Sequence, residues 1–404
     1  NQIILLMKRF IIYSFCLLAI GLALVSCSQD DESPISNITS IDAISFNVGT
    51  DNYKTTRATP ITASNYNSLM NSFAVTAVTD TANLGSPSFD NYYIGSLSTP
   101  SVFTNEHNGL WAGETYYWPA DTATKLSFYA ISPALDNYEL VGFGTRKDFI
   151  RLEAATDPAK QVDYMSAYVP AITRNTFDGS VNLQFKHIMS QIRFAVDLST
   201  IKEGYQISID SIKLYNIWNS CTYRISRHEV WPKNGWGAPK AWGEKKRSTF
   251  IAPVNPVENL SRSRGRVVLT PDDGALLLPP QMFLWSTNYD SISTKPKDKY
   301  QCIEITCKIY NTANKQYVVG SETEYGKIYI RLARVGYNED NDQDTGAYND
   351  DTKAPIWRSG RCYTYVLKFD GSDGFGTDED GKSHNIHFNV DVEDWKEPST
   401  NLNF

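Results

Sequence analysis

The sequence predicts an all-β protein, built from antiparallel β-sandwiches, behind an N-terminal export signal. Short runs of alternating apolar and polar residues recur along the chain, and each is bounded by Gly, Pro, Asn, Asp or Ser, which is typical of half-buried strands. No long segment shows the 3.6-residue period of an amphipathic helix. Aromatic residues make up 13% of the chain, with 24 Tyr and 9 Trp, and these residue types favour strands.

The expected strands are distributed along the chain. The first spans 41–49, where Ile44, Phe46 and Val48 alternate with polar residues. A second begins at Ser72. The others are expected at 125–131, 181–185, 191–196, 207–217, 301–310, 327–332, 363–369 and 384–392. Short helices are expected at 64–70 and 162–166. A series of this kind usually forms antiparallel sandwiches.

The first thirty residues indicate export and lipidation. Met7-Lys8-Arg9 is basic, an apolar run covers 10–25, and the run ends at Ser26-Cys27. This order resembles the bacterial lipobox, in which the cysteine thiol is diacylated and the signal is removed before it. Acyl chains on Cys27 would then anchor the protein in outer-membrane lipid. The alternatives are a plain signal peptide with an incidental cysteine, or an N-terminal membrane helix.

Net charge and the segment after Cys27 narrow the class of partner. The polar, acidic stretch 28–34 is either a solvated tether or a signal for export to the cell surface. The formal net charge is −7. An acidic protein gains nothing from the field of a polyanion, which argues against nucleic acid as a partner. No second apolar run has membrane-spanning length, so we expect the lipid to be the only anchor.

The sequence contains no recognisable catalytic constellation, and we predict a protein that is not an enzyme and needs no cofactor. The signatures of serine hydrolases, zinc proteases and phosphate-binding loops are absent. A structural role is expected for His187. Of the six cysteines, Cys302 and Cys307 lie five apart in a strand-like run, which directs them to opposite faces, so no metal site is predicted there.

Two loops admit a ligand-binding interpretation beside a structural one. The run 340–346 carries Asp at the first, third and fifth positions of a calcium loop, but its Gly is one place late and no Glu closes it. The cluster of Trp231, Trp236 and Trp242 is either a sugar-stacking platform or a loop folded onto its own domain. We favour a solvated acidic loop for 340–346 and a loop folded onto its own domain for the tryptophans.

Five stretches follow one another along the chain: the Cys27 lipobox with the alternating strand and Arg57-Ala58, YYWP at 116–119 before LSFYA at 126–130, FKH at 185–187 before SQIRF at 190–194, LLLPPQ at 276–281, and YTYVL at 363–367 with FNVDVEDW at 388–395. In their order and spacing the chain resembles the fimbrillins, the type V pilus subunits of Gram-negative gut and oral bacteria (the fimbrillin A and Mfa-like group). The region 218–266 matches least.

The resemblance implies two tandem transthyretin-like β-sandwich domains and a mechanism of assembly. An arginine-specific protease would cut between Arg57 and Ala58 and release the strand that carries Ile44, Phe46 and Val48. A donor strand from a neighbouring fimbrial subunit would replace it. The donor candidates lie at the carboxy terminus and are Phe388, Val390, Val392, Leu402 and Phe404.

We therefore expect five segments. They are a signal peptide at 1–26, a lipidated tether at 27–40, a removable strand with its cleavage loop at 41–57, an N-terminal sandwich at 58–178, and a C-terminal sandwich with the donor tail at 179–404. The turn-rich stretch 175–180 sets the boundary between the two sandwiches.

Three functions remain open on the sequence. A structural subunit of a surface fimbrium explains the lipobox, the Arg57-Ala58 bond and the alternating carboxy-terminal segment. A surface-anchored glycan-binding lipoprotein explains the lipobox and the tryptophans, and a pilus-tip adhesin would combine the two. A secreted hydrolase lacks a nucleophile or an acid–base pair. The position in a fibre, whether stalk, anchor or tip, is left open.

Overall fold

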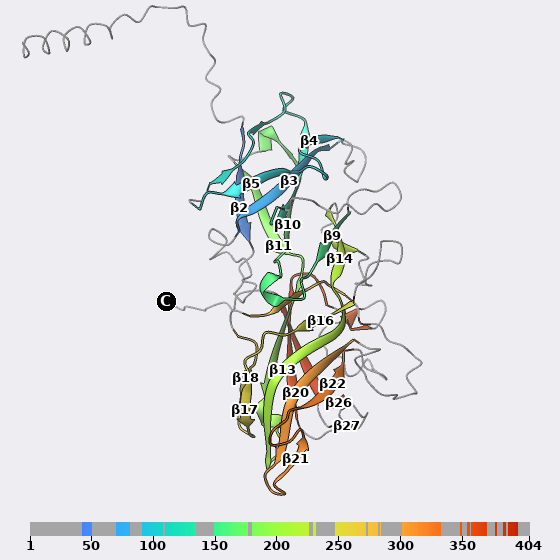
Figure 1. The fold of residues 1–404 in the computed structure, drawn as a ribbon. Coiled ribbons are helices and arrows are strands. Elements are labelled where there is room, and N and C mark those ends of the chain that lie inside the picture. The colour runs from blue at the N-terminus through green and yellow to red at the C-terminus, as the bar shows by residue number, and fades with distance from the viewer. Residues whose placement is uncertain are drawn as a thin grey trace, which may run out of the picture. The chain divides into compact units, whose positions relative to one another are not determined.

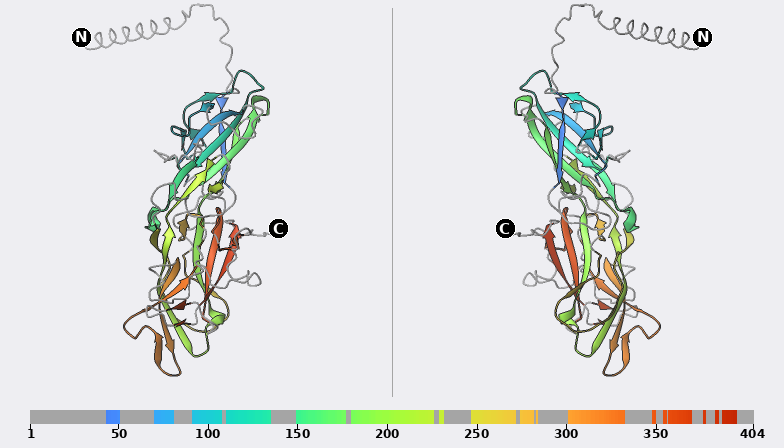
Figure 2. Two further views of the ribbon diagram at one scale, coloured as in Figure 1. Left: turned by 90° about the vertical axis from the view of Figure 1, so that its right-hand side faces the viewer. Right: turned by 90° about the vertical axis from the view of Figure 1, so that its left-hand side faces the viewer.

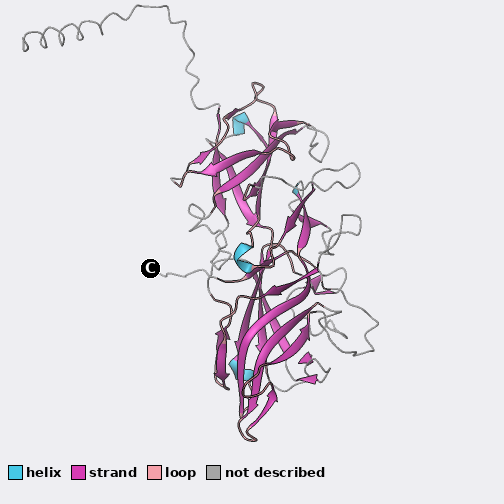
Figure 3. Ribbon diagram, viewed as in Figure 1, coloured by secondary structure: helices cyan, strands magenta, loops and turns pink. Residues whose placement is uncertain are grey.

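The computed structural model describes most of the chain beyond residue 42. The described residues are 43–50, 70–80, 91–107, 110–134, 149–176, 180–225, 229–231, 247–271, 274–281, 283, 301–332, 348–349, 354–355, 357–369, 376–377, 383–384 and 387–394. Strands dominate this part, and the helices in it are short turns (Figure 3). The all-β class expected from the alternating runs is confirmed.

The first sheet has eight strands in the order β2-β11-β10-β8-β3-β5-β6, with β4 beside β3 (Figure 1). The strands are β2 (Phe46–Thr50), β3 (Ser72–Asp80), β4 (Tyr92–Ile94), β5 (Ser101–Asn105), β6 (Trp111–Ala112), β8 (Lys125–Ser132), β10 (Met165–Thr173) and β11 (Val181–His187). All of these pairs are antiparallel except β2 with β11, which is parallel.

Alternation along these strands builds the smaller of two hydrophobic cores. In β11 the pattern is strict, because Val181, Leu183 and Phe185 are buried while the residues between them are exposed. Phe73 and Phe128 are fully buried in the same core. The period of two residues in a strand directs every second side chain to one face, which is why the sequence pattern predicts this core.

Two facing sheets enclose the larger core. One has five strands: β12 (Ser190–Asp197), β18 (Arg266–Val268), β19 (Leu276–Leu278), β25 (Arg361–Lys368) and β28 (His387–Asp394). The other has eight: β13 (Tyr205–Trp218), β16 (Arg247–Ile251), β17 (Val257–Leu260), β20 (Cys302–Asn311), β21 (Gln316–Val319), β22 (Gly326–Arg331), β26 (Gly376–Thr377) and β27 (Ser383–His384). Phe194 from the first and Ile212, Ile303 and Ile328 from the second meet in this core.

A three-stranded sheet links segments that are distant in the sequence. It consists of β9 (Phe149–Glu153), β14 (Ser220–Arg224) and β15 (Glu229–Trp231). The Tyr223 hydroxyl is hydrogen-bonded to the Ser166 hydroxyl of β10. Ile150 and Tyr223 belong to the larger core, together with Tyr129 of the first sheet. The second half of the chain therefore also covers part of the first sheet.

The remaining elements are short. They are the strands β1 (Ala43–Ile44), β7 (Tyr116–Tyr117), β23 (Tyr348–Asn349) and β24 (Ala354–Pro355) and the 3-10 turns η2 (Pro158–Lys160), η3 (Arg174–Thr176) and η4 (Leu198–Thr200). None of the helical turns in the described ranges has the length or the apolar composition needed to cross a bilayer.

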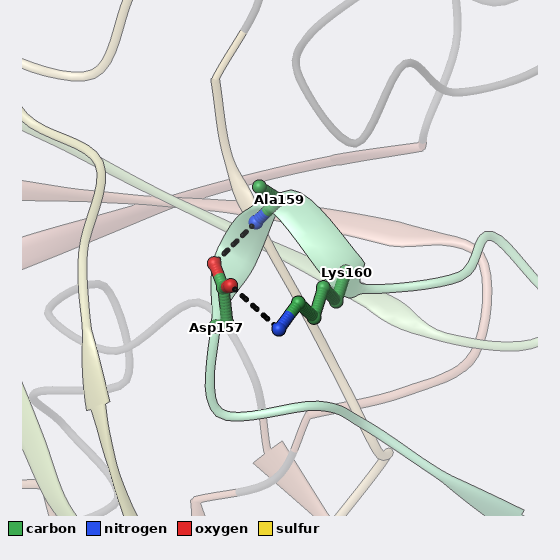
Figure 4. Close-up of polar contacts among 3 residues, drawn as sticks. All are labelled: Asp157, Ala159 and Lys160. Atoms are coloured by element: carbon green, nitrogen blue, oxygen red, sulfur yellow. Dashed lines mark hydrogen bonds and ion pairs between the residues drawn. The ribbon is translucent and has the colours of Figure 1, made fainter.

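The helix expected at 162–166 is wrong. A single 3-10 turn, η2, precedes this segment, and β10 begins at Met165. The Asp157 carboxylate accepts the Ala159 N–H at 3.1 Å and lies 3.6 Å from the Lys160 ammonium (Figure 4). Gln161 is already extended, so the turn ends after one cycle. The helix expected at 64–70 falls outside the described residues except for Met70.

A boundary after residue 178 would assign β11 to the C-terminal sandwich. In the structure β11 lies inside the first sheet and contributes to its core. The chain enters the second group of sheets at Ser190, where β12 begins. Between them, Ile188 and Met189 are buried in the larger core. A turn-rich stretch often marks a boundary between domains, but here the strands on either side of it, β10 and β11, belong to one sheet.

Candidate functional site: the edge that holds the first strand

In the segment around β2, buried apolar side chains alternate with exposed polar ones. Ile44 and Val48 are 7% and 4% exposed, Phe46 between them is half-buried, and Ser45 and Asn47 are exposed. All three apolar side chains belong to the smaller core or pack against it. The alternation that predicts the strand therefore also identifies the face that it buries.

Phe46 lies over a floor of three aromatic rings. Its ring centroid is 5.8 Å from that of Phe73, 4.9 Å from that of Phe103 and 5.9 Å from that of Phe128, each in an edge-to-face arrangement. These rings come from β3, β5 and β8. Edge-to-face pairs at such distances stabilise a contact beyond the area that they bury.

The edge of β11 sets the register of β2. The two strands run parallel, with Phe46 opposite Val181, Asn47 opposite Asn182 and Val48 opposite Leu183. The Asn47 amide donates to the Asn182 side-chain oxygen at 2.8 Å on the exposed face. In the described part of the chain, no further strand pairs with the outer edge of β2. We call the edge of β11 together with the rings of Phe73, Phe103 and Phe128 the β2 site.

The geometry of the β2 site suits an exchangeable strand. An edge strand is bonded on one side only, so its removal opens one ladder and leaves the other strands of the sheet paired. Parallel pairing is slightly less stable per residue than antiparallel pairing. If β2 left, it would expose the N–H and C=O groups of β11 and the three rings, and both require a new partner.

Phe388, Val390 and Val392 lie on β28. This strand pairs antiparallel with β25 and is the last strand of its sheet; it is drawn in red in Figure 2. Asp391 of the same strand forms an ion pair with Arg266 at 2.6 Å. Leu402 and Phe404 lie outside the described residues, as do Cys27, Arg57 and Ala58.

His187 is a buried histidine beside a carboxylate. Its Nδ1 lies 2.8 Å from the Asp163 carboxylate, and both side chains are buried. The described ranges contain no group of three or more His, Cys, Asp or Glu that could hold a metal ion. Trp231 belongs to β15, while Trp236, Trp242 and the run 340–346 lie outside the described residues.

The four cysteines after Cys27 are buried and carry reduced thiols. Burial raises the pKa of Cys221 and of Cys307 to about 12. A thiol with so high a pKa is protonated at neutral pH and is a poor nucleophile.

The sequence did not identify the partners of β2. Phe103 and Asn182 are part of the β2 site, and neither belongs to a recognisable sequence motif. Phe103 lies in β5, where burial alternates residue by residue, so the same period-two pattern would have placed it in a core. That core residues from β3, β5 and β8 converge on Phe46 depends on the order of the strands.

Comparisons with known proteins are consistent with this architecture. A model of the fimbrillin-like family matches residues 56–395. The chain therefore belongs to the fimbrillin-like family. A comparison with curated proteins gave no match.

Solved structures of fimbrial proteins are similar to this chain. A fimbrial protein from Bacteroides vulgatus ATCC 8482 has 15% sequence identity and a TM-score of 0.51, and the match covers 88% of this chain and 100% of that chain. The tip fimbrial protein Mfa3 from Porphyromonas gingivalis, with C-terminal truncation, has 11% identity and a TM-score of 0.38 over 87% and 100% of the two chains. The fimbrial anchor protein Mfa2 from the same organism has 13% identity and a TM-score of 0.28 over 87% and 98%.

Proposed function

We propose that this protein is a structural subunit of a bacterial cell-surface fimbrium, assembled head to tail by replacement of its first strand. Membership of the fimbrillin-like family supports a fimbrial, non-enzymatic role. The observation that carries the proposal is the placement of β2. It is a terminal strand, parallel to its one neighbour, and its apolar face lies on the aromatic core.

In this scheme the precursor is incorporated into the fibre in three steps. Acyl chains on Cys27 anchor the precursor in the outer membrane, and a protease specific for arginine cuts between Arg57 and Ala58. The cut falls seven residues after Thr50, the last residue of β2, so it separates the strand from the rest of the fold. The emptied β2 site then accepts a strand from a neighbouring subunit, which is the same protein or a related one.

The effect of cleavage follows from two free energies, the gain from burying the strand and the cost of binding it as a separate molecule. Burial of three apolar side chains contributes about 5–9 kcal/mol, at about 1.5–3 kcal/mol each. Before cleavage this energy must offset only the conformational entropy lost when a covalently attached segment becomes ordered. After cleavage the strand is a separate molecule, and its association costs roughly 4–15 kcal/mol of translational and rotational freedom. The two terms are of similar size, so a cut strand is held weakly and can exchange.

A strand from a neighbouring subunit would replace both the hydrogen bonds and the apolar contacts that are lost with β2. It satisfies the ladder of β11 and covers the rings again, which is recognition by strand addition. The contact joins two different surfaces of identical subunits, so it does not close on itself and propagates as a filament. The donor candidates in this scheme are Phe388, Val390, Val392, Leu402 and Phe404.

Digestion with an arginine-specific protease tests the proposal. The protein from Ser28 onwards is cut and then analysed by mass spectrometry and by size in SDS without heating. We expect one cut after Arg57 and SDS-resistant oligomers. The control Arg57→Ala should stay uncut and monomeric at the same concentration. A cut product that remains monomeric at high concentration would refute strand replacement.

The lipid anchor is tested separately. The full precursor, expressed in a bacterium that processes lipoproteins, should incorporate labelled palmitate, and Cys27→Ser should abolish the label. The control Cys16→Ser removes a cysteine inside the signal and should leave the label unchanged. Equal labelling of Cys27→Ser and the unchanged protein would refute lipidation at this residue.

A further inference from the structure

Glu304 is buried on the face of the eight-stranded sheet of β13, β20 and β22 that points away from the larger core. Its neighbours in β20, Ile303 and Ile305, belong to that core, so alternation directs Glu304 to the opposite face. Its side chain is 0% exposed, and among the described residues neither carboxylate oxygen has a hydrogen-bond partner. A buried carboxylate in this state is costly to the fold unless its charge is paired or removed.

Lys213 lies directly opposite Glu304 in the neighbouring strand. The two residues are register partners in β13 and β20, which lie side by side in the sheet (Figure 1). Lys213 Nζ is 3.7 Å from Glu304 Oε1, a separation within the range of an ion pair but longer than a hydrogen bond. The Lys213 side chain is 31% exposed, so the pair meets solvent only at its lysine end. Each strand is paired along both edges, which fixes the backbone on either side of the pair.

Two tyrosines on the same face of the sheet flank this pair. Tyr329 of β22 is the register partner of Glu304 on the other side of β20, and Tyr215 follows Lys213 by two residues in β13. The two ring centroids are 6.4 Å apart, so the rings approach each other across β20. Tyr329 is 1% exposed. Bulky rings in this position limit the access of water to the carboxyl end of the pair.

We propose that the side chains of Lys213 and Glu304 join in an amide bond, which links β13 to β20 covalently. The Lys213 ammonium first passes a proton to the Glu304 carboxylate. The neutral amine then attacks the carboxyl carbon and forms the new C–N bond. The carboxyl hydroxyl leaves with a proton from the nitrogen, as one molecule of water. No atom is oxidised or reduced, and the step needs no co-reactant.

Three physical conditions favour this bond. The sheet holds the reacting groups 3.7 Å apart, so a small shift brings them to the separation of about 3–3.5 Å at which reacting atoms are poised. The product is neutral, so its formation removes two charges from a position where the carboxylate is poorly solvated. The water that forms can leave at the exposed lysine end, and the scarcity of water at the carboxyl end disfavours hydrolysis.

The link would strengthen the sheet that encloses the larger core. β13 and β20 pair from Tyr205 opposite Asn311 to Tyr215 opposite Cys302, and Lys213 and Glu304 lie near one end of this ladder. An amide bond keeps the two strands together where the hydrogen bonds of the ladder can open. A cross-link between positions far apart in the sequence also restricts the unfolded chain, as a disulfide does. The inference goes beyond the proposed function and does not depend on strand replacement.

Intact-mass spectrometry of the uncut chain from Ser28 onwards tests the bond. After incubation of the folded protein at neutral pH, most molecules should be lighter by one water. Trypsin digestion of the denatured product should give one joined peptide that contains both residues, with no cut after Lys213. Lys213→Arg keeps the positive charge, but its guanidinium stays protonated and cannot form the bond, so this variant should keep its full mass. The matched control Lys327→Arg changes a lysine opposite Thr306 and should still lose the water.

Two results would overturn the inference. A chain that keeps its full mass after prolonged incubation holds an ordinary ion pair at this position, and this result is decisive even if Lys213→Arg fails to fold. A loss of water that persists in folded Lys213→Arg arises elsewhere, for example from succinimide formation at an Asp-Gly bond. Either result leaves strand replacement standing, because digestion after Arg57 tests that proposal separately.

Discussion

Gln281 connects four parts of the second half of the fold, and its replacement should destabilise that half. The side chain is 1% exposed. Its oxygen accepts the Trp218 N–H at 3.0 Å and the Gln301 amide at 3.1 Å, and its nitrogen donates to the carbonyls of Trp218 and Pro279 at 3.2 and 3.1 Å. Its backbone forms a reciprocal pair of hydrogen bonds with Trp357.

The variant Gln281→Met keeps the length of the side chain and removes its four hydrogen bonds. A typical intramolecular hydrogen bond contributes about 0.5–1.5 kcal/mol net, so the expected loss is about 2–6 kcal/mol. The backbone bonds to Trp357 remain. The loss should therefore appear as a lower free energy of unfolding rather than as a different fold.

Urea unfolding followed by tryptophan fluorescence measures this loss, because Trp218 and Trp357 flank the substitution. Amide hydrogen exchange locates it, and the Trp218 N–H should exchange faster in the variant. The control Gln316→Met changes an exposed residue of β21 and should stay within about 0.5 kcal/mol of the unchanged protein. Equal stability of Gln281→Met and Gln316→Met would refute the role assigned to this side chain.

Three further predictions follow from buried groups. At pH 8 the thiols of Cys221 and Cys307 should not react with a thiol reagent until the protein is unfolded, because burial raises the pKa of both to about 12. Burial also raises the pKa of Tyr363 to about 12 from 10.0. Above pH 10 the unfolded state loses this proton first, so the free energy of unfolding should fall between about pH 10 and 12, and Tyr363→Phe should flatten the decline. Asp163→Ala removes the partner of His187 and should lower the free energy of unfolding by about 1–3 kcal/mol.

Each of these predictions has an outcome that contradicts it. Rapid labelling of either thiol in the folded protein would show that it is accessible. An unchanged alkaline decline in Tyr363→Phe would assign the pH dependence to other groups. The control for Asp163→Ala is Asp210→Ala, since Asp210 is exposed on β13, and equal effects of the two would remove the special role of the buried pair.

Strand alternation made much of the fold predictable. The expected strands at 125–131, 181–185 and 207–217 correspond to β8, β11 and β13, with bounds that differ by no more than two residues. Alternation is a local property, because the geometry of one strand sends successive side chains to opposite faces. The helix expected at 162–166 failed because a short apolar run has no period of its own and the sheet decided its conformation.

The residue pattern was enough to predict the all-β class, the alternation of Ile44, Phe46 and Val48, and the resemblance to the fimbrillins, which family membership confirms. The folded arrangement was needed to show that β2 pairs with β11, that the pair is parallel, and that β3, β5 and β8 each supply a ring beneath Phe46. Alternation shows which face of a strand is buried, but it carries no information about its neighbour. Pairing joins Phe46 to Val181 across more than a hundred residues, and this choice depends on the packing of the whole sheet.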